Sequence, residues 1–277
     1  MGTEPGLLAE DGDAPIGIFD SGVGGLTVLK AIQSRLPNES LIYLGDTARI
    51  PYGTRSVATV GRYASEDAAF IESQNVKLIV VACNTASAIA VNHLERQCQV
   101  PVLGVISPGA RCAARATRNR RVAVIATEAT IASRAYEKEI LAVDPGIEVV
   151  SRACPLLVPL AEEGWIDHPV TRAVVAEYLE DFGPSRIDTL VLGCTHYPIL
   201  RRVISEVMGD SVHYVDSGEA VAEEVALLIK NRKMERRAGG EPVERFYVTD
   251  APSRFGRIAE LFLGRQVGSV ELVGLGG

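Results

Sequence analysis

The chain alternates short apolar runs with stretches of helical period, and this alternation continues along almost the whole sequence. Strands that alternate with helices favour an α/β fold built on largely parallel sheet. The pattern predicts strands at Ile16–Phe19, Leu41–Leu44, Leu78–Ala82, Val102–Val105, Val122–Ile125, Glu148–Arg152, Thr189–Leu192, His213–Val215 and Arg245–Val248. Because ligands bind outside the carboxyl ends of parallel strands, the residues that follow each strand are the first candidates for function.

A weak internal repeat relates two pairs of these strands. The segment from Leu78 to Thr85 matches the segment from Thr189 to His196, 111 residues later, and each is a buried-type strand that ends in a cysteine and a polar residue. A fainter match, at an offset of 106 residues, relates Gly17–Ser21 to Ala123–Thr127. Buried strands also resemble one another by chance, so the repeat is a hypothesis that predicts two related halves.

We therefore expect two pseudo-symmetric, doubly wound α/β domains with mainly parallel sheets and the active site in the cleft between them. The chain switches halves near Ser107–Arg111 and returns near His213–Asp216, where a strand again leads into a helix start. The prediction is a polar N-terminal extension at residues 1–14, a first domain at 15–108 plus 216–277, and a second domain at 109–215.

Composition excludes several classes of protein. The 28 Lys and Arg against 35 Asp and Glu give a net charge of −7, which argues against a protein that coats nucleic acid or lies on a membrane surface. No stretch approaches the roughly 18 apolar residues of a membrane span, and the N-terminus lacks the pattern of a signal peptide. Five cysteines without a CxxC pair indicate neither a disulfide framework nor a zinc site, so we expect free thiols in the cytoplasm.

A glycine-rich loop follows the first strand, from Asp20 to Thr27. Glycines there let the backbone approach a ligand, and the helix start that follows points free N–H groups at an anion. A nucleotide loop is one interpretation, with Asp46 as the acid that binds ribose. However, Thr27 stands where the dinucleotide motif has its third glycine, and the Lys-Ser/Thr of a P-loop is absent. The nucleotide interpretation also leaves the other strand ends unexplained.

Cys83 and Cys194 close two matching strands, each before a predicted helix start. The dipole of a helix N-terminus favours a thiolate, so we expect a thiol pKa lowered from about 8.5 toward neutrality. Either cysteine alone could be an ordinary core residue, but two in equivalent positions indicate chemistry. Cys98, Cys112 and Cys154 lack this context and are interpreted as structural.

Two thiols that face one cleft suit a reaction with mirror-image directions, namely racemisation or epimerisation. One group removes a carbon-bound proton and the other delivers a proton to the opposite face. Each thiol needs a neighbour to manage its protonation, and the candidates are Asp20 or Asp46 in the first half and His196 in the second. A structural histidine is the alternative for His196. None of the four histidines forms an HExxH motif, so metal-dependent hydrolysis has little support.

Hydrogen-bond donors for a substrate carboxylate also stand at the strand ends. They are Ser21, Asn84, Thr85, Thr127 and Thr195, together with backbone N–H groups of the same helix starts. Any one of these side chains is ordinarily a helix cap, and their recurrence at corresponding strand ends is what favours a binding site. The turn Pro51-Tyr52-Gly53 could close over the pocket.

In their order along the chain, the motifs resemble those of the glutamate racemases, within the cofactor-independent aspartate/glutamate racemase superfamily. The resemblance covers residues 16–220. It depends on the segments Phe19–Leu26, Gly45-Asp46 with Pro51–Gly53, Ala82–Ser87, Gly104–Gly109 and Leu192–Pro198. Two departures are Ala126, where many members have glycine, and the Met1–Ala14 extension, which has no obvious counterpart.

The resemblance implies an isomerase of bacterial cell-wall synthesis that supplies D-glutamate for peptidoglycan, without pyridoxal phosphate, metal or other cofactor. It implies that Cys83 acts on D-glutamate and Cys194 on L-glutamate, that Asp20 and His196 assist, and that Glu162 matches an acidic residue of the family's PLxE segment. The substrate-binding positions that it implies are Asp20, Ser21, Tyr52, Gly53, Asn84, Thr85, Thr195 and His196, with a contribution from Thr127.

Several alternatives stay open at this stage. An aspartate or hydantoin racemase of the same superfamily is the nearest, and a nucleotide-binding protein is another. The five arginines within residues 111–121 and the basic segment 231–237 could bind a protein partner, although such runs are usually solvated helix faces. Some glutamate racemases inhibit DNA gyrase, so a secondary interaction with gyrase is a further alternative. A homodimer is the expected assembly.

Overall fold

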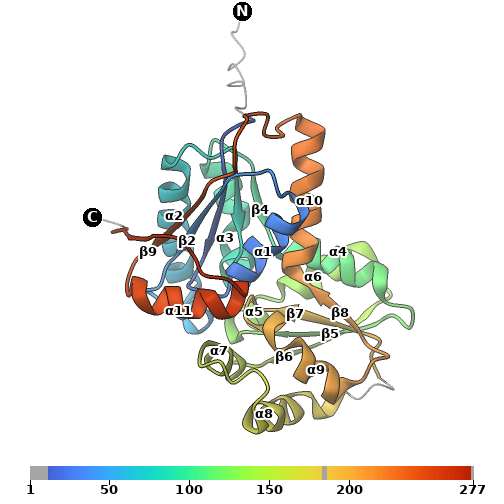
Figure 1. The fold of residues 1–277 in the computed structure, drawn as a ribbon. Coiled ribbons are helices and arrows are strands. Elements are labelled where there is room, and N and C mark those ends of the chain that lie inside the picture. Colours follow the sequence, from blue (N-terminus) through green and yellow to red (C-terminus); the bar gives the residue numbers. More distant parts are fainter. Residues whose placement is uncertain (1–11, 183–185, 276–277) are drawn as a thin grey trace, which may run out of the picture.

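A six-stranded parallel sheet forms the larger part of the molecule (Figure 1). The computed structural model describes residues 12–182 and 186–275, so residues 1–11 of the predicted extension lie outside the described residues. The strands are β1 (Ile16–Asp20), β2 (Leu41–Gly45), β3 (Leu78–Val81), β4 (Val102–Gly104), β9 (Glu244–Val248) and β10 (Val270–Leu272), and their order is β10-β9-β2-β1-β3-β4. Every neighbouring pair is parallel.

A second parallel sheet contains four strands, in the order β6-β5-β7-β8. They are β5 (Arg121–Ala126), β6 (Glu148–Ala153), β7 (Thr189–Gly193) and β8 (His213–Asp216). The order β6-β5-β7-β8 repeats the order β2-β1-β3-β4, with β5 in the place of β1 and β7 in the place of β3. These are the strand pairs that the internal repeat relates, so the prediction of an α/β fold with two related, mainly parallel halves is confirmed.

Helices cover both faces of the larger sheet. Alternate residues of a strand point to opposite faces, and in β1 the side chains of Ile16 and Ile18 join one core cluster while Phe19 joins another. The first cluster lies under α1 (Leu26–Arg35), α10 (Ser217–Arg232) and α11 (Pro252–Leu263). The second lies under α2 (Val57–Ser73) and α3 (Asn84–Gln97). The short 3₁₀ helix η1 (Tyr52–Thr54) precedes α2.

The smaller sheet is covered in the same way. Val122 and Val124 of β5 pack toward α4 (Ile106–Ala116) and α6 (Ala135–Val143), while Ala123 and Ile125 pack toward the opposite face. That face carries α7 (Leu157–Glu162), α8 (Pro169–Leu179) and α9 (Arg201–Met208). The remaining elements are α5 (Glu128–Ser133), η2 (Glu180–Phe182) and η3 (Tyr197–Leu200).

Two helices carry the chain between the sheets. After β4 the chain runs through α4 into β5, and after β8 it returns through α10 to β9. The two helices pack against each other, and Figure 1 shows them at the junction of the larger and smaller parts. The first core cluster runs continuously from β1 and β2 through α10 to β7, so the two sheets share one apolar core.

A buried ion pair joins distant parts of the chain at the amino ends of the strands in the larger sheet. Lys77, just before β3, contacts Glu39, which precedes β2, and both side chains are almost fully buried. The Lys77 Nζ also donates to the carbonyls of Gly12 (2.7 Å) and Met234 (2.8 Å). No helix in the described part of the chain is both long and apolar enough to cross a membrane.

Candidate active site

The carboxyl ends of four strands, two from each sheet, meet at a cavity of about 90 Å³. Its lining includes residues within two positions of the ends of β1, β3, β5 and β7, namely Ser21, Cys83, Thr127 and Cys194. The other lining residues are Gly22, Ile50, Pro51, Tyr52, Gly53, Asn84, Thr85, Val158, Glu162, Thr195 and His196. A larger cleft of about 820 Å³ runs between α1, α10 and β8, but none of the predicted site residues lines it. The smaller cavity is therefore the candidate site.

Cys83 forms the N-cap of α3. Its Sγ donates to Ser21 Oγ (3.6 Å) and accepts from the Ala86 N–H (3.5 Å). Burial, reinforced by the charge of Asp20, raises the pKa of the thiol to about 12 despite the Ala86 N–H. The expectation that the helix start lowers the pKa of Cys83 is thus wrong, because removal from water outweighs one backbone donor. At neutral pH, Cys83 carries its proton.

Cys194 begins a chain of polar groups that runs along the cavity wall through His196 to Glu162. Its Sγ lies 3.8 Å from His196 Nδ1, and His196 Nε2 lies 3.1 Å from Glu162 Oε1. Arg254 of α11 approaches the same carboxylate (3.5 Å). Burial opposes a charge on His196, but the contacts with Cys194 and Glu162 outweigh it and raise the His196 pKa to about 10. His196 is therefore an imidazolium at neutral pH. Unlike Cys83, Cys194 is followed by the 3₁₀ helix η3 rather than by an α-helix.

Asp20 lies behind the cavity wall and is fully buried. Its Oδ2 accepts from the Gly22 N–H (2.9 Å), and Thr195 Oγ1 lies 3.4 Å from its Oδ1. Burial raises the pKa of Asp20, against the charge of His196 and the backbone N–H groups. Asp20 thus links a loop of the larger sheet to the strand end that carries Cys194. Its negative charge also raises the pKa of Cys83.

Three threonine hydroxyls form a cluster at one end of the cavity. Thr85 Oγ1 lies 2.8 Å from Thr127 Oγ1 and 3.1 Å from Thr130 Oγ1, and Thr127 and Thr130 are 2.9 Å apart. The cluster joins the start of α3 to the start of α5, across the two sheets. The first N–H groups of α3 have no partner within the helix, so they can bind an anion there.

The Asn84 side chain is held by groups from other elements. Its Oδ1 accepts from Tyr136 Oη (2.7 Å), and its Nδ2 lies 3.5 Å from Ser217 Oγ. These contacts fix the orientation of the amide beside the cavity.

Close backbone approach explains the glycine-rich loop. A Cβ on Gly24 would lie 2.3 Å from Thr195 Oγ1 and 2.4 Å from His196 Nδ1. Thr27 Oγ1 lies 3.0 Å from the carbonyl oxygens of both Gly24 and Thr195, so its one hydrogen is donated between the loop and the strand end of the other sheet. The loop is therefore shaped to pack against the strand end of the other sheet. Thr27, which stands where the dinucleotide motif has its third glycine, thus makes the contact with the Thr195 carbonyl.

Asp46, the alternative neighbour for the first thiol, does not line the cavity. Its carboxylate binds Arg49, Tyr52 and Thr249. The structure therefore leaves Asp20 as the acidic group near Cys83.

Three polar residues near the cavity were not predicted. Thr130 lies three positions after Thr127, a spacing that brings side chains together in a helix and could have revealed it. Asp67 lies on the same buried face of α2 as Val60 and Ala64. An acidic residue at a position where the helical pattern expects an apolar one could have revealed it. Arg254 had no signal in the sequence. Within residues 12–182 and 186–275, no group of three or more His, Cys, Asp or Glu side chains is arranged to hold a metal ion.

Comparison with known proteins decides the family. A family model described as Asp/Glu/Hydantoin racemase matches residues 22–225. The chain belongs to the Asp/Glu/Hydantoin racemase family. A glutamate racemase from Geobacter metallireducens is 52% identical over 260 residues, which cover 94% of this chain and 96% of the relative.

Solved structures agree with this assignment. The glutamate racemase isoform RacE1 from Bacillus anthracis superposes with a TM-score of 0.90 at 40% identity, over 94% of this chain and 97% of the other. A glutamate racemase from Francisella tularensis, solved in complex with D-glutamate, gives 0.89 at 41% identity over 95% and 98%. This family member is a racemase, an isomerase in its class of reaction.

Proposed function

We propose that this racemase interconverts L-glutamate and D-glutamate by proton transfers between the substrate α-carbon and two thiols. The observation that carries the proposal is that Cys83 and Cys194 line one cavity from equivalent strands, β3 and β7, of the two related sheets. A reaction that inverts one carbon needs a proton donor and a proton acceptor on opposite faces, and two related halves supply such a pair. Relatives about 50% identical carry the name glutamate racemase, which favours glutamate over aspartate or a hydantoin.

In the L-to-D direction, Cys194 takes the α-proton and Cys83 gives its own proton to the opposite face. The high pKa of Cys83 suits the donor role, because the thiol is protonated at neutral pH. The imidazolium of His196, 3.8 Å from Cys194 Sγ, stabilises negative charge on that sulfur. Glu162 holds the imidazolium from its other nitrogen. In the D-to-L direction Cys83 must first give up its proton, and Asp20 is the acceptor that we propose; the Cys83 thiolate then takes the α-proton, and the Cys194 thiol gives its proton to the opposite face.

The carbanion that forms between the two transfers needs stabilisation from fixed dipoles in a water-poor cavity. The groups proposed to bind the substrate are Ser21, Tyr52, Gly53, Asn84, Thr85, Thr127, Thr195 and His196, with Asp20 behind them. Thr85 and Thr127 are already joined to each other, and the free N–H groups of α3 adjoin Cys83. We propose that no cofactor is required, because the two thiols account for both proton transfers.

The wider setting of the enzyme is also a proposal. Residues 15–108 with 216–277 would form one lobe and residues 109–215 the other, a division supported by the membership of the two sheets. The role would be supply of D-glutamate for peptidoglycan, in the cytoplasm, where a reducing environment keeps both thiols functional. A homodimer and a secondary interaction with DNA gyrase stay predictions, to be checked by light scattering and by a supercoiling assay.

Substrate identity is tested by chiral chromatography of L- and D-glutamate, and of L- and D-aspartate, after incubation with reduced enzyme and no added cofactor. We expect each glutamate enantiomer to approach a racemic mixture and aspartate to turn over far more slowly. Faster turnover of aspartate would contradict the glutamate assignment, and dependence on added pyridoxal phosphate would contradict the two-thiol chemistry.

A further inference from the structure

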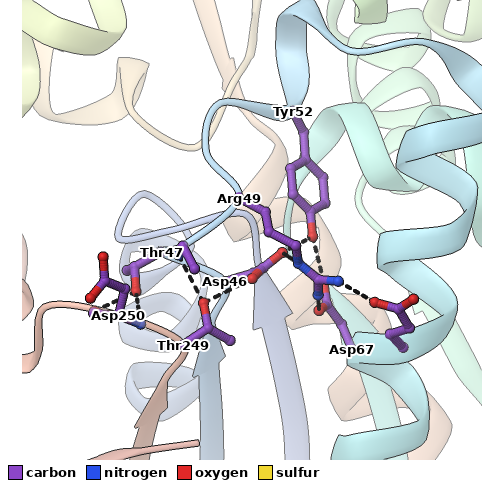
Figure 2. A network of polar contacts seen from close by, with 9 residues as sticks. Asp46, Thr47, Arg49, Tyr52, Asp67, Thr249 and Asp250 are labelled. Atoms are coloured by element: carbon purple, nitrogen blue, oxygen red, sulfur yellow. Dashed lines mark hydrogen bonds and ion pairs between the residues drawn. The ribbon is translucent and has the colours of Figure 1, made fainter. Parts of the chain in front are cut away.

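Tyr52 and Gly53 contribute to the wall of the cavity, and the Tyr52 side chain belongs to a polar network that Figure 2 shows. Its members, here called the Tyr52 network, are Asp46, Arg49, Tyr52, Glu66, Asp67 and Thr249. Asp46 and Asp67 are fully buried, and Tyr52 is 1% exposed. The network does not touch either thiol, and the proposed proton transfers do not use it.

The contacts converge on one phenol and one guanidinium. Tyr52 Oη contacts Asp46 Oδ2 and lies 2.9 Å from Asp67 Oδ2. Arg49 binds Asp46 Oδ2 through Nε (2.6 Å) and Asp67 Oδ1 through a terminal nitrogen (2.8 Å), and its other terminal nitrogen contacts Glu66. Figure 2 shows Tyr52 and Arg49 both directed at the two aspartates.

Hydrogen counting shows that one more proton is needed. A phenol carries one hydrogen, so Tyr52 cannot donate to both Asp46 and Asp67. An ionised carboxylate has no hydrogen to donate, so the second contact of Tyr52 Oη requires a protonated carboxyl group. Charge points the same way, because Asp46, Glu66 and Asp67 would give three negative charges around the single positive charge of Arg49.

The extra proton belongs on Asp67. Asp46 accepts on both oxygens, from Thr249 Oγ1 (2.9 Å) on Oδ1 and from Arg49 and Tyr52 on Oδ2, so neither oxygen is left to hold a hydrogen. Asp67 accepts from Arg49 on Oδ1 only, so its Oδ2 is left to hold a hydrogen. Burial, and then the charge of Asp46, raises the pKa of Asp67 well above its usual value, and Arg49 and the contact with Tyr52 oppose this shift only in part.

We propose that Asp67 is a positioning residue that stays protonated and donates to Tyr52 Oη, which in turn donates to ionised Asp46. This ordered chain holds η1 against the cavity. Gly53 of η1 lies so close to Thr127 that an added Cβ would come within 2.7 Å of the Thr127 Cβ. The placement of Tyr52 therefore sets how the loop meets the threonine cluster of the other half. The inference relies on the proposed function in taking this cavity as the glutamate site.

Substitution of each aspartate by asparagine distinguishes the protonated from the ionised carboxyl group. Asn at position 67 keeps an acceptor for Arg49 and a donor for Tyr52, so D67N should keep the KM for both enantiomers within about threefold of the wild-type value, whereas D67A loses both bonds. D46N removes the charge that Tyr52 and Arg49 bind, so D46N and D67A should raise KM at least about tenfold, with a smaller change in kcat. E72Q is the matched control, because Glu72 lies on the same helix and instead accepts from the Gln99 N–H.

The proposal is overturned if D67N raises KM as much as D67A, or if D46N is as mild as D67N. Infrared difference spectra of wild type minus D67N test the protonation of Asp67 without measuring turnover. The spectra should show the C=O stretch of a protonated carboxyl group, and the absence of this band would also overturn the proposal. This test remains available even if D67A fails to fold. A wild-type enzyme that does not racemise glutamate would instead refute the proposed function, and the infrared result would still decide the state of Asp67.

Discussion

Replacement of Gly24 by alanine tests whether close approach of the glycine-rich loop sets the geometry around Cys194. The new Cβ would lie 2.3 Å from Thr195 Oγ1, 2.4 Å from His196 Nδ1 and 2.5 Å from His196 Cε1. The imidazole cannot move aside freely. Its Nδ1 faces Cys194 Sγ, its Nε2 is held by Glu162, and the edge of Phe262 packs against the ring at a centroid distance of 5.6 Å.

Two effects of this substitution can be sized. Overpacking of a close-packed site costs about 1–3 kcal/mol of unfolding free energy. Displacement of a positioned group by about 1 Å can cost on the order of 100-fold in rate. Gly24→Ala should therefore lose about 100-fold in kcat/KM while losing at most about 3 kcal/mol of stability, so the variant stays folded at 25 °C.

Gly61→Ala is the matched control. Gly61 lies within helix α2, and a Cβ there would meet nothing within 4 Å. Relief of a helix-interior glycine should stabilise the protein by about 0.5–1 kcal/mol and leave kcat/KM unchanged. Both variants are measured by urea denaturation and by initial rates of glutamate racemisation. If Gly24→Ala kept kcat/KM within about threefold of wild type, the inferred role of this contact would be refuted.

Three further predictions concern groups around the site and in the core. The raised pKa of His196, about 10 against an ordinary 6.5, means that its charge stabilises the fold below pH 6.5 and that this contribution is lost as pH rises through about 10. Glu162→Gln removes one cause of the high pKa, so the alkaline limb of the kcat/KM profile should move to lower pH; an unmoved limb would show that Glu162 does not support the imidazolium. Lys77→Met strands the buried Glu39 carboxylate and should cost about 3–5 kcal/mol in urea unfolding, while folded enzyme keeps its kcat, and a loss below 1 kcal/mol would contradict the burial argument. Thr130→Val removes a hydroxyl of the threonine cluster and should raise KM about fivefold, the worth of one hydrogen bond; an unchanged KM would exclude a role for the cluster in binding.

Much of the fold was predictable because the central strands β1, β2, β3, β5 and β7 are buried on both faces. Such strands form continuous apolar runs, and all nine predicted strands are present with ends shifted by one residue at most. The strand β10 was missed because it has only three residues, lies at the sheet edge and is largely exposed. The internal repeat predicted two related halves, and the two sheets share one strand order because β5 and β7 take the places of β1 and β3.

The site was predictable as far as strand ends define it. Cys83, Thr127 and Cys194 reach the cavity because they follow parallel strands. The sequence does not show how far burial raises a thiol pKa relative to the lowering by a helix N-terminus. For this reason the expected lowering of the Cys83 pKa was wrong. Nor does sequence order indicate that Asp46 pairs with Asp67 of α2 through Tyr52 rather than serving a thiol.

The central claim is that two thiols carry one proton transfer each. The most direct measurement follows L-glutamate and, separately, D-glutamate in D₂O without cofactor, by polarimetry and by mass spectrometry of the α-position, with wild type, Cys83→Ala and Cys194→Ala. We expect wild type to invert both enantiomers with one solvent deuterium at the α-carbon of each product, and neither variant to invert either enantiomer. Inversion at the wild-type rate by one of the single-cysteine variants, or product that keeps its original α-hydrogen, would contradict the two-thiol account.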